Sequence, residues 1–215
     1  MSPSFFQGET PEFLPLQRFA ATLARAGVIE RIRLQPNVDD EPSLFRYRSI
    51  LSKNEKSNIR ICAGHSFFSN HEALTAALGE SVDRYCFREF SPNESAVVFA
   101  SYKAMGTNAL DPFSVAGISD ELRTHSTDSR IRPFDERTKF HWVKGWSLSL
   151  NRCKWVPLHL VTLNPLLQEQ IREKGEPFLR LPISSGLAAG RSNDDAIYRG
   201  ICEIIERDAY MITYL

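Results

Sequence analysis

Two segments of the chain, residues 73–84 and 196–207, share the pattern A-x6-E-x-x-[DE]-R. Positions i, i+3 and i+4 lie on one face of a helix, so each segment, if helical, presents two carboxylates and one guanidinium side by side. These side chains are Glu80, Asp83 and Arg84 in the first segment and Glu203, Glu206 and Arg207 in the second. The separation of the segments is too long for a solenoid repeat and favours a duplicated half.

Carboxylates arranged in this way are suited to binding a hard cation. Mg²⁺ takes oxygen ligands, usually one or two carboxylates together with substrate phosphates, and two such helices would offer up to four carboxylates to one cavity. The alternative is a solvated salt-bridge face, the more common role of such a stripe, worth a few tenths of a kcal/mol per ion pair. The repetition in register favours a functional role, but charge spacing alone does not identify the ligand.

The elements that must position these residues are two long helices. The spacings Ser69–Glu72 and Ser192–Asp195 both fit a helix-capping pattern, Ser-x-x-acid. Each is followed by a run with apolar residues at helical spacing, at 73–87 and 196–215. A further helix is predicted to begin at Pro15 and to end near Gly27.

Alternating apolar residues predict the strands, which cover 28–34, 44–51, 59–63, 140–150 and 156–163. Residues 91–137 are mixed, with short helical pieces around 95–105 and a polar loop at 123–137. Residues 168–175 fit a charged turn or short helix, and 182–190 a flexible segment of small residues. We therefore expect an α/β (α+β) fold, with a flexible segment at 1–14 and a single domain at 15–215.

Composition excludes several other classes. Twenty-six Lys and Arg residues balance 26 Asp and Glu residues, so no nucleic-acid or anionic-membrane partner is expected. No apolar run approaches the ~20 residues of a membrane span, and no signal peptide is visible, so we expect a soluble, cytoplasmic protein. The cysteines lack the close pairing of a zinc site, and no Walker sequence is present.

The histidines do not indicate a hydrolase, since His125, His141 and His159 show no grouping with a nucleophile and an acid. His141, Trp142 and Trp146 lie on a predicted strand. For these three residues, core packing or a hydrogen-bonded polar tip is a better interpretation than a ligand role.

Three segments resemble the signature motifs of the YcaO family, ATP-using enzymes that modify peptide backbones. The sequence SSGLAAGRSNDDAIYRGICEIIERDA (184–209) resembles S-N-G-L-A-A-G followed by G-L-x-E-x-x-E-R-D-A, and AGHSFFSNHEALTAALGESVDRY (63–85) resembles the first signature. The sequence WVKGWSLSLNRCKWVPLHLVTL (142–163) is similar to the W-V-x-G-x-S-L run of the azoline-forming branch. The motifs occur in the family's order and span most of the chain.

The resemblance implies mixed sheets and two signature helices that flank a nucleotide site, with ATP and Mg²⁺ as cofactors. The implied Mg²⁺ ligands are Glu80, Asp83, Glu203 and Glu206. The implied ATP-binding residues are Glu80, Arg84, Arg191, Asp195, Glu203 and Arg207. No residue is assigned as catalytic.

The implied reaction is cyclodehydration, in which ATP activates a backbone amide of a ribosomally made precursor peptide. It forms thiazoline or oxazoline from Cys, Ser or Thr, as in thiazole/oxazole-modified peptide and bacteriocin biosynthesis. The implied partners are the precursor peptide, a leader-binding protein, a flavin dehydrogenase of the same pathway and a second copy of the chain. The alternatives are a truncated, non-catalytic remnant or scaffold, and a thioamide-forming or accessory relative.

The sequence departs from the family pattern at four positions. Asp83 and Asp195 replace the usual Glu, and Ser185 replaces Asn. His65 lies between Gly64 and Ser66, so the second glycine of G-x-G is absent. Family members also continue well beyond E-R-D-A, so we expect a chain truncated at its C-terminus, whose activity on its own is doubtful. An apolar final helix would then lack the partner that covers it.

Overall fold

A computed structural model describes residues 13–37, 39–40, 42–53 and 60–214, so most of the segment expected to be flexible at 1–14 lies outside the described residues. The chain forms two compact units. One contains the N-terminal part to Cys86 together with Ser184–Leu215, and the other contains Phe87–Ile183. The expectation of one domain at 15–215 stays a prediction.

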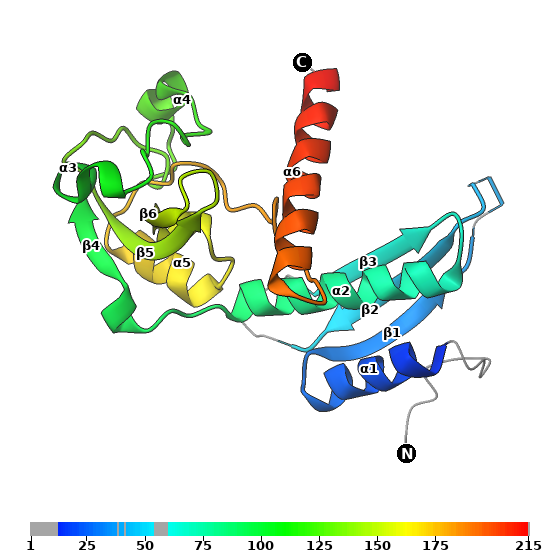
Figure 1. Cartoon of the computed structure of the whole chain (residues 1–215). Helices are drawn as coiled ribbons and strands as arrows, with labels where there is room; N and C mark the ends of the chain where they lie inside the picture. Colours follow the sequence, from blue (N-terminus) through cyan, green and yellow to red (C-terminus); the bar gives the residue numbers. More distant parts are fainter. Residues whose placement is uncertain (1–12, 38, 41, 54–59, 215) are drawn as a thin grey trace. The chain divides into compact units, whose positions relative to one another are not determined.

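The first unit is a three-stranded antiparallel sheet with helices packed against it (Figure 1). Its elements are α1 (Leu14–Arg25), β1 (Ile29–Gln35), β2 (Phe45–Leu51), β3 (Ile61–Ser66), α2 (Asn70–Glu89) and α6 (Asn193–Tyr214). The strand order is β1-β2-β3. The core between sheet and helices includes Leu23 of α1, Ile32 and Leu51 of the sheet, and Leu74 and Leu78 of α2.

Local sequence signals fix the ends of these helices. The hydroxyl of Ser69 accepts a hydrogen bond from the Glu72 N–H at 3.1 Å, and that of Ser192 accepts one from the Asp195 N–H at 3.2 Å, so both predicted caps are confirmed. Gly27 follows α1 with φ 72°, a conformation that only glycine adopts without strain.

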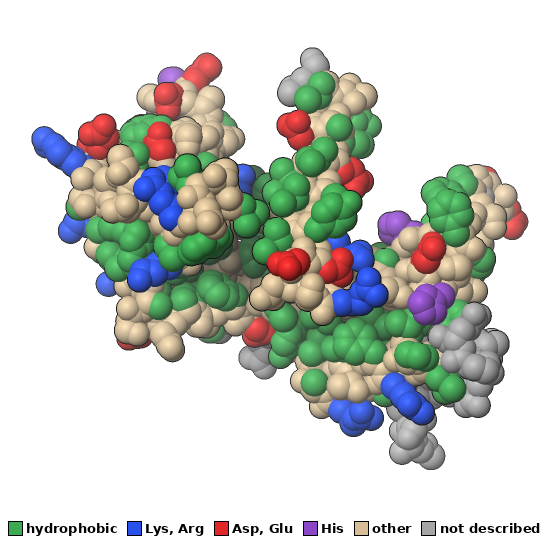
Figure 2. Space-filling view, viewed as in Figure 1, with side chains coloured by type: hydrophobic (Ala, Val, Ile, Leu, Met, Phe, Trp, Pro, Cys, Tyr) green, Lys and Arg blue, Asp and Glu red, His purple; other side chains and the backbone are tan. Residues whose placement is uncertain are grey.

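Helix α6 exposes most of its side chains. Gly200 is its one buried residue among those described. Figure 2 shows hydrophobic side chains over much of its visible surface, and the exposed large apolar residues include Ile201, Ile204, Ile205 and Tyr210. This agrees with the expectation that the apolar surface of the final helix is uncovered.

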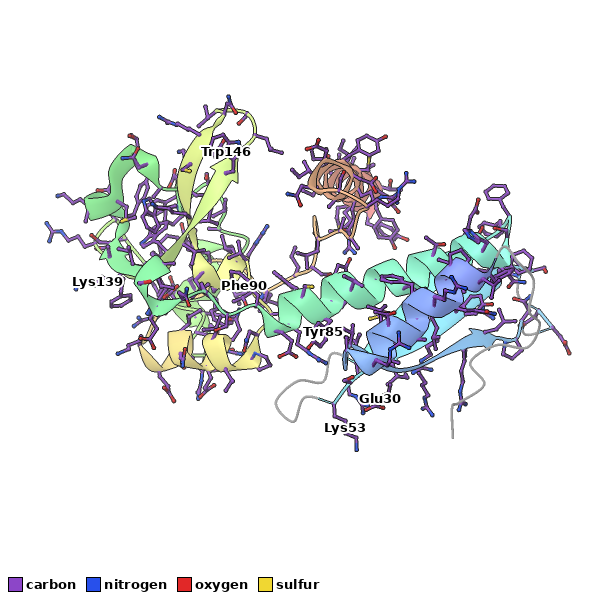
Figure 3. The ribbon with its side chains drawn as sticks, turned by 60° about the horizontal axis from the view of Figure 1, so that its bottom comes forward. Glu30, Lys53, Tyr85, Phe90, Lys139 and Trp146 are labelled. Carbon is purple, nitrogen blue, oxygen red and sulfur yellow. The ribbon has the colours of Figure 1, made fainter. Side chains whose placement is uncertain are left out.

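The second unit is built on another three-stranded antiparallel sheet, in the order β4-β5-β6. Its elements are β4 (Val98–Ser101), α3 (Tyr102–Met105), α4 (Asp120–His125), β5 (Lys139–Ser147), β6 (Arg152–Pro157) and α5 (Pro165–Glu173), with 3-10 turns at Glu94–Ala96, Gly106–Asn108 and Leu158–Leu160. Trp142 is fully buried and its indole N–H donates to the Ala100 carbonyl at 2.8 Å, as predicted. Trp146 does not pack in a core: it is 57% exposed near the end of the β5–β6 hairpin (Figure 3).

Three of the expected elements differ here. The strand predicted at 156–163 is wrong, because β6 runs from Arg152 and ends at Pro157, which lacks the N–H needed to continue the ladder. Strand β4 lies where only helical pieces were expected; its four residues are too few to show a period. Helix α4 begins before the predicted polar loop and includes its first residues.

The alternative for residues 168–175 is settled in favour of a short helix, since α5 spans Pro165–Glu173 and is capped by the side chain of Asn164. Among the residues that the structure describes, no helix is long and apolar enough to cross a membrane.

Candidate functional site

The two predicted sets of charged residues form matching ion pairs in the first unit. They are called the acidic stripes below: Glu80, Asp83 and Arg84 on α2, and Glu203, Glu206 and Arg207 on α6. On α2, Arg84 Nε lies 2.8 Å from Glu80 Oε1. On α6, Arg207 lies 2.8 Å from Glu203 Oε1 through its Nη2 and 3.0 Å through its Nε. Both are i,i+4 pairs, as the spacing predicted, and all four side chains are partly exposed, so each pair adds only a few tenths of a kcal/mol.

Asp83 differs from these residues because its side chain is largely buried and one of its oxygens lacks a hydrogen-bond partner. Its side chain is 10% exposed, its Oδ1 has no hydrogen-bond partner among the described atoms, and the nearest guanidinium nitrogen, Arg84 Nε, is 4.0 Å away. Burial and the negative charge of Glu80 raise the pKa of Asp83 from 3.8 to about 7, with Arg84 acting in the opposite direction. Glu203 adds a smaller contribution that also raises this pKa.

The segment before α6 folds back against that helix through close backbone contacts. Gly186, with φ 87°, donates its N–H to Glu203 Oε2 at 2.9 Å. A Cβ atom on Gly200 would lie 2.5 Å from the Gly186 oxygen, so only glycine at position 200 permits this approach. Glu203 is therefore held by Gly186 on one oxygen and by Arg207 on the other.

The segment before α6 also contacts α2. Figure 3 shows α2 beside α1, with Tyr85 labelled toward the C-terminal end of α2. A Cβ atom on Gly79 would lie 3.8 Å from the Cβ atom of Ala189, an ordinary van der Waals distance. This contact, together with the effect of Glu203 on Asp83, brings three predicted carboxylates toward one region: Glu80, Asp83 and Glu203.

Three predicted residues are placed differently. Asp195 accepts from the Arg191 N–H at 2.9 Å and pairs with Arg199 at 2.9 Å; the Arg191 N–H, and less strongly Arg199, lower the pKa of Asp195. The Arg191 side chain is 95% exposed. The Glu206 side chain is exposed and makes no hydrogen bond or ion pair with the other described residues. Across residues 13–37, 39–40, 42–53 and 60–214, no group of three or more His, Cys, Asp or Glu side chains is placed to hold a metal ion.

The sheet contributes groups to this region that the sequence did not assign to it. Cys62 of β3 is buried, and burial followed by the charge of Glu80 raises the pKa of its thiol to about 11. Ser49 and Ser81, both fully buried, lie 2.5 Å apart between β2 and α2. The alternation of apolar residues predicted a strand at 59–63 that includes Cys62. No sequence pattern indicated that Cys62 would lie near Glu80. At this pKa the thiol is neutral and unreactive near pH 7.

A sequence profile described as YcaO cyclodehydratase, ATP- and Mg²⁺-binding, matches residues 67–215. The match covers more than half of the chain and includes both acidic stripes. The chain therefore belongs to the YcaO family, and ATP and Mg²⁺ are the cofactors of that family. No curated protein sequence matches the chain.

Solved structures share the fold at low sequence identity. A heterocyclase in complex with substrate and cofactor matches with a TM-score of 0.67 and 19% identity, over 94% of this chain and 28% of that one. The YcaO protein from Methanopyrus kandleri, bound with AMPPCP and Mg²⁺, matches with a TM-score of 0.58 and 17% identity, over 95% of this chain and 45% of that one.

The E. coli microcin synthetase McbBCD complex matches with a TM-score of 0.51 and 13% identity, over 81% of this chain and 38% of that one. The chain thus spans less than half the length of each of these proteins. The α/β fold expected from the sequence is confirmed by these similarities.

Proposed function

We propose that this chain carries the ATP- and Mg²⁺-binding part of a peptide cyclodehydratase. In the reaction, a Cys, Ser or Thr side chain of the substrate peptide adds to the preceding backbone carbonyl. The resulting oxygen receives the γ-phosphoryl group of ATP, and phosphate then departs with that oxygen. Loss of the amide proton completes the C=N bond of a thiazoline or oxazoline. An amide oxygen is a very poor leaving group before phosphorylation, so positioning and charge stabilisation are the expected sources of rate.

The proposal rests on Asp83, whose side chain is 10% exposed and whose Oδ1 has no hydrogen-bond partner among the described atoms. A largely buried carboxylate without enough compensating charge is costly, and a divalent cation, which takes carboxylate oxygens as ligands, would supply that charge. Glu80 and Glu203 lie near enough to act on its pKa. Their ion pairs with Arg84 and Arg207 are partly exposed and weak, so exchanging them for a metal ion costs little.

Each remaining predicted residue has a role in this proposal. Arg84 and Arg207 would neutralise phosphate oxygens of a bound nucleotide, since a guanidinium matches phosphate geometry. Glu206 would be a further carboxylate ligand for the metal ion. Asp195 and Arg191 bind the nucleotide from the start of α6, where Asp195 already orders the Arg191 backbone.

Substrate and partners follow from the same proposal. A precursor peptide is the substrate, a leader-binding protein presents it, and a flavin dehydrogenase oxidises azolines to azoles in the same pathway. We place the enzyme in the cytoplasm, where ATP is available, and propose that it forms one domain over 15–215 and assembles as a homodimer. The heterocyclase and microcin synthetase neighbours support peptide chemistry only through their fold.

The exposed apolar surface of α6 favours one alternative, a non-catalytic binding or scaffold protein. Mass spectrometry of a Cys-, Ser- and Thr-rich peptide incubated with the protein, its leader-binding partner, ATP and Mg²⁺ separates the two. Loss of one water per modified residue, with equal release of phosphate, is the expected result. Exchange of oxygen for sulfur would indicate thioamide formation, and an unmodified peptide with no phosphate release would contradict the proposal.

A further inference from the structure

The three-stranded sheet of the first unit has a covered face and an exposed face. Helices α1 and α2 pack on the face that presents Ile32, Tyr47 and Cys62, since residues of both helices share one core with these three. Successive residues of a strand point to opposite faces, so the sequence neighbours of Ile32 and Tyr47 point away from the helices. Four arginines are placed in this way and are called the arginine face below: Arg31, Arg33, Arg46 and Arg48.

The arginine face brings like charges together. Arg33 of β1 is the register partner of Arg48 on β2, which places their Cβ atoms about 5 Å apart on one face of the sheet. Arg31 and Arg46 are the diagonal neighbours of this pair. Like charges directly opposite each other destabilise a sheet, so these arginines weaken the first unit unless a negative charge is supplied to them.

The described residues around the sheet supply little of that charge. Glu30 is the one acidic residue of the three strands, and it pairs with Arg60 at 2.7 Å. Asp39 and Asp40, in the connection between β1 and β2, form no ion pair with any described residue. The chain as a whole has no net charge, so the positive charge is a local property of this face.

Three of the four arginines have side chains available to a ligand. Arg31, Arg33 and Arg48 are exposed, and their side chains make no hydrogen bond or ion pair with the described residues. Arg46 is partly exposed and donates from Nη2 to the Pro36 carbonyl at 3.1 Å, so it contributes charge but is already engaged. A guanidinium presents its donors in a planar fork that matches the two oxygens of a carboxylate.

We propose that the arginine face is a docking surface for an extended, acidic segment of a protein or peptide partner. On each of the two strands the arginines are two residues apart, which is about 7 Å along the strand. Carboxylates at alternate positions of an extended segment have the same spacing, so successive acidic side chains can each meet a guanidinium. The surface lies on the side of the sheet opposite α2 and its acidic stripe, and binding there involves no nucleotide.

A nucleic acid fits these observations less well than an acidic peptide. Surfaces that bind single-stranded nucleic acids combine positive charge with aromatic side chains on which bases stack. The outward-facing residues of the three strands include no aromatic side chain; besides the arginines they are Gln35, Ile50, Ile61, Ala63 and His65. A chain without net charge also has no long-range attraction for a polyanion.

The test measures the fluorescence anisotropy of a labelled, blocked octapeptide of alternating Glu and Ser, titrated with the full chain. Saturable binding that weakens several-fold from about 50 to about 200 mM NaCl is expected, because exposed ion pairs are screened by salt. The matching octapeptide of Gln and Ser should not bind. Binding of a single-stranded DNA octanucleotide, or of vesicles of phosphatidylcholine and phosphatidylserine, as tightly as the Glu-Ser peptide would overturn the assignment to an acidic peptide.

Variants locate the binding. The double substitution Arg33→Gln and Arg48→Gln should weaken peptide binding roughly five- to tenfold, the range of two exposed ion pairs. It should not lower the urea concentration at the midpoint of unfolding, because it removes a repulsion. The matched control is Arg18→Gln with Arg25→Gln, at two exposed arginines of α1 on the covered side of the sheet, and it should change affinity less than about twofold.

Unchanged affinity in the Arg33 and Arg48 variant, an equal loss in the control, or a wild-type chain that does not bind the Glu-Ser peptide would overturn the inference. Because neither nucleotide nor Mg²⁺ is present, these results are independent of the proposed cyclodehydratase activity.

Discussion

Asp83 and Glu203 lie on different helices, α2 and α6, and the carboxylate of Glu203 raises the pKa of Asp83. The larger causes are the burial of Asp83 and the charge of Glu80, and together they raise this pKa to about 7. The two acidic stripes are thus electrostatically coupled. A site of this kind binds a cation and a proton in competition.

Mg²⁺ affinity should therefore depend on pH near neutrality. Above about pH 7 Asp83 is ionised and ready to bind, and below it the metal must displace a proton, so affinity should fall up to tenfold per pH unit. Titration of Mg²⁺ at pH 6, 7 and 8 in the presence of a non-hydrolysable ATP analogue checks this. An affinity that does not change across this range would argue against Asp83 as a ligand.

Asp83→Asn should stabilise the metal-free protein at high pH. The pKa of Asp83 is higher in the folded state, so the folded state binds the extra proton between about pH 4 and pH 7, and the free energy of unfolding falls as pH rises through that window. The asparagine side chain has no proton to lose, so above pH 7 the free energy of unfolding of Asp83→Asn should exceed that of the wild type by up to about 4 kcal/mol. Urea unfolding at pH 5 and pH 8 without Mg²⁺ measures it.

The matched control for this experiment is Asp194→Asn, an equal change of charge at an exposed residue of α6. It should not alter the pH dependence of stability. A wild-type stability that rises between pH 5 and pH 8, with no gain in Asp83→Asn, would contradict the raised pKa of Asp83.

Glycine-to-alanine substitution should have opposite effects at two positions near the site. A Cβ atom on Gly64 would lie 2.2 Å from the Ala77 nitrogen, so Gly64→Ala must separate β3 from α2 and should cost more than about 3 kcal/mol. Gly79 has room for a Cβ atom, and Gly79→Ala should stabilise α2 by about 1 kcal/mol. Thermal unfolding distinguishes the two; destabilisation by both would contradict the packing described.

Arg123 should be essential to the second unit although it lies outside the candidate site. It is 2% exposed and donates to carbonyl oxygens of several segments, including Phe178 at 2.8 Å and Leu179 at 2.7 Å. Arg123→Met leaves those acceptors unsatisfied and should cost about 3 kcal/mol or more. Arg137→Met, at an exposed arginine, is the control and should change stability by less than about 0.5 kcal/mol. Equal effects of the two changes in chemical unfolding would refute this role.

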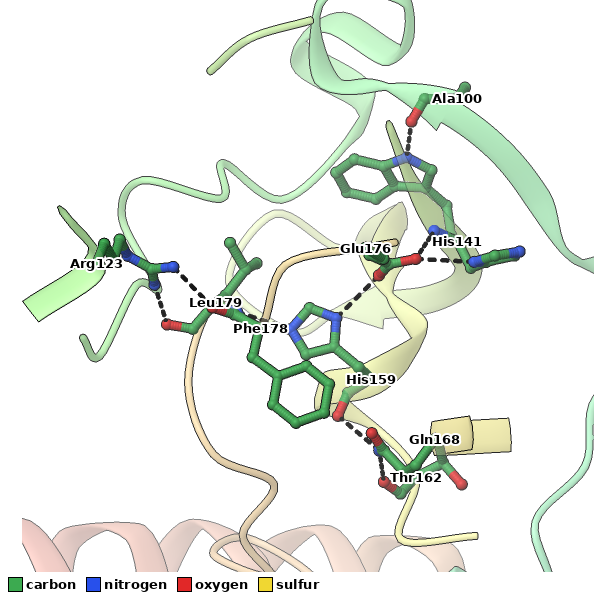
Figure 4. A network of polar contacts seen from close by, with 10 residues as sticks. Ala100, Arg123, His141, His159, Thr162, Gln168, Glu176, Phe178 and Leu179 are labelled. Carbon is green, nitrogen blue, oxygen red and sulfur yellow. Dashed lines mark hydrogen bonds and ion pairs between the residues drawn. The ribbon is translucent and has the colours of Figure 1, made fainter. Parts of the chain in front are cut away.

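Arg123 also shows why part of the fold could not be predicted. Two of its partners are 55 and 56 residues away in the chain (Figure 4), and a charged residue in a segment predicted to be a polar loop is expected at the surface. The caps at Ser69 and Ser192 and the i,i+4 pairs were predictable because the partners lie within one helical turn. Strand β4 was not, because it depends on pairing with β5.

In the candidate site, too, local features were predictable and tertiary ones were not. The spacing predicted that Asp83 and Glu80 lie on one face of a helix, but the burial that raises the pKa of Asp83 arises from tertiary packing. The proximity of Glu203 to Asp83 depends on the contact of α2 with the segment before α6, made at Gly79 and Ala189. Neither the burial of Asp83 nor the contact between Gly79 and Ala189 can be predicted from neighbouring residues in the sequence.

The most direct test of the account is calorimetric titration of the 215-residue chain with Mg²⁺ and a non-hydrolysable ATP analogue. We predict saturable binding that is lost in Glu203→Gln and in Glu80→Gln, both of which should remain folded, and that persists in Glu121→Gln, an exposed residue of α4. Unchanged nucleotide affinity in both site variants would contradict the assignment of the acidic stripes, as would a folded wild-type chain that binds no nucleotide.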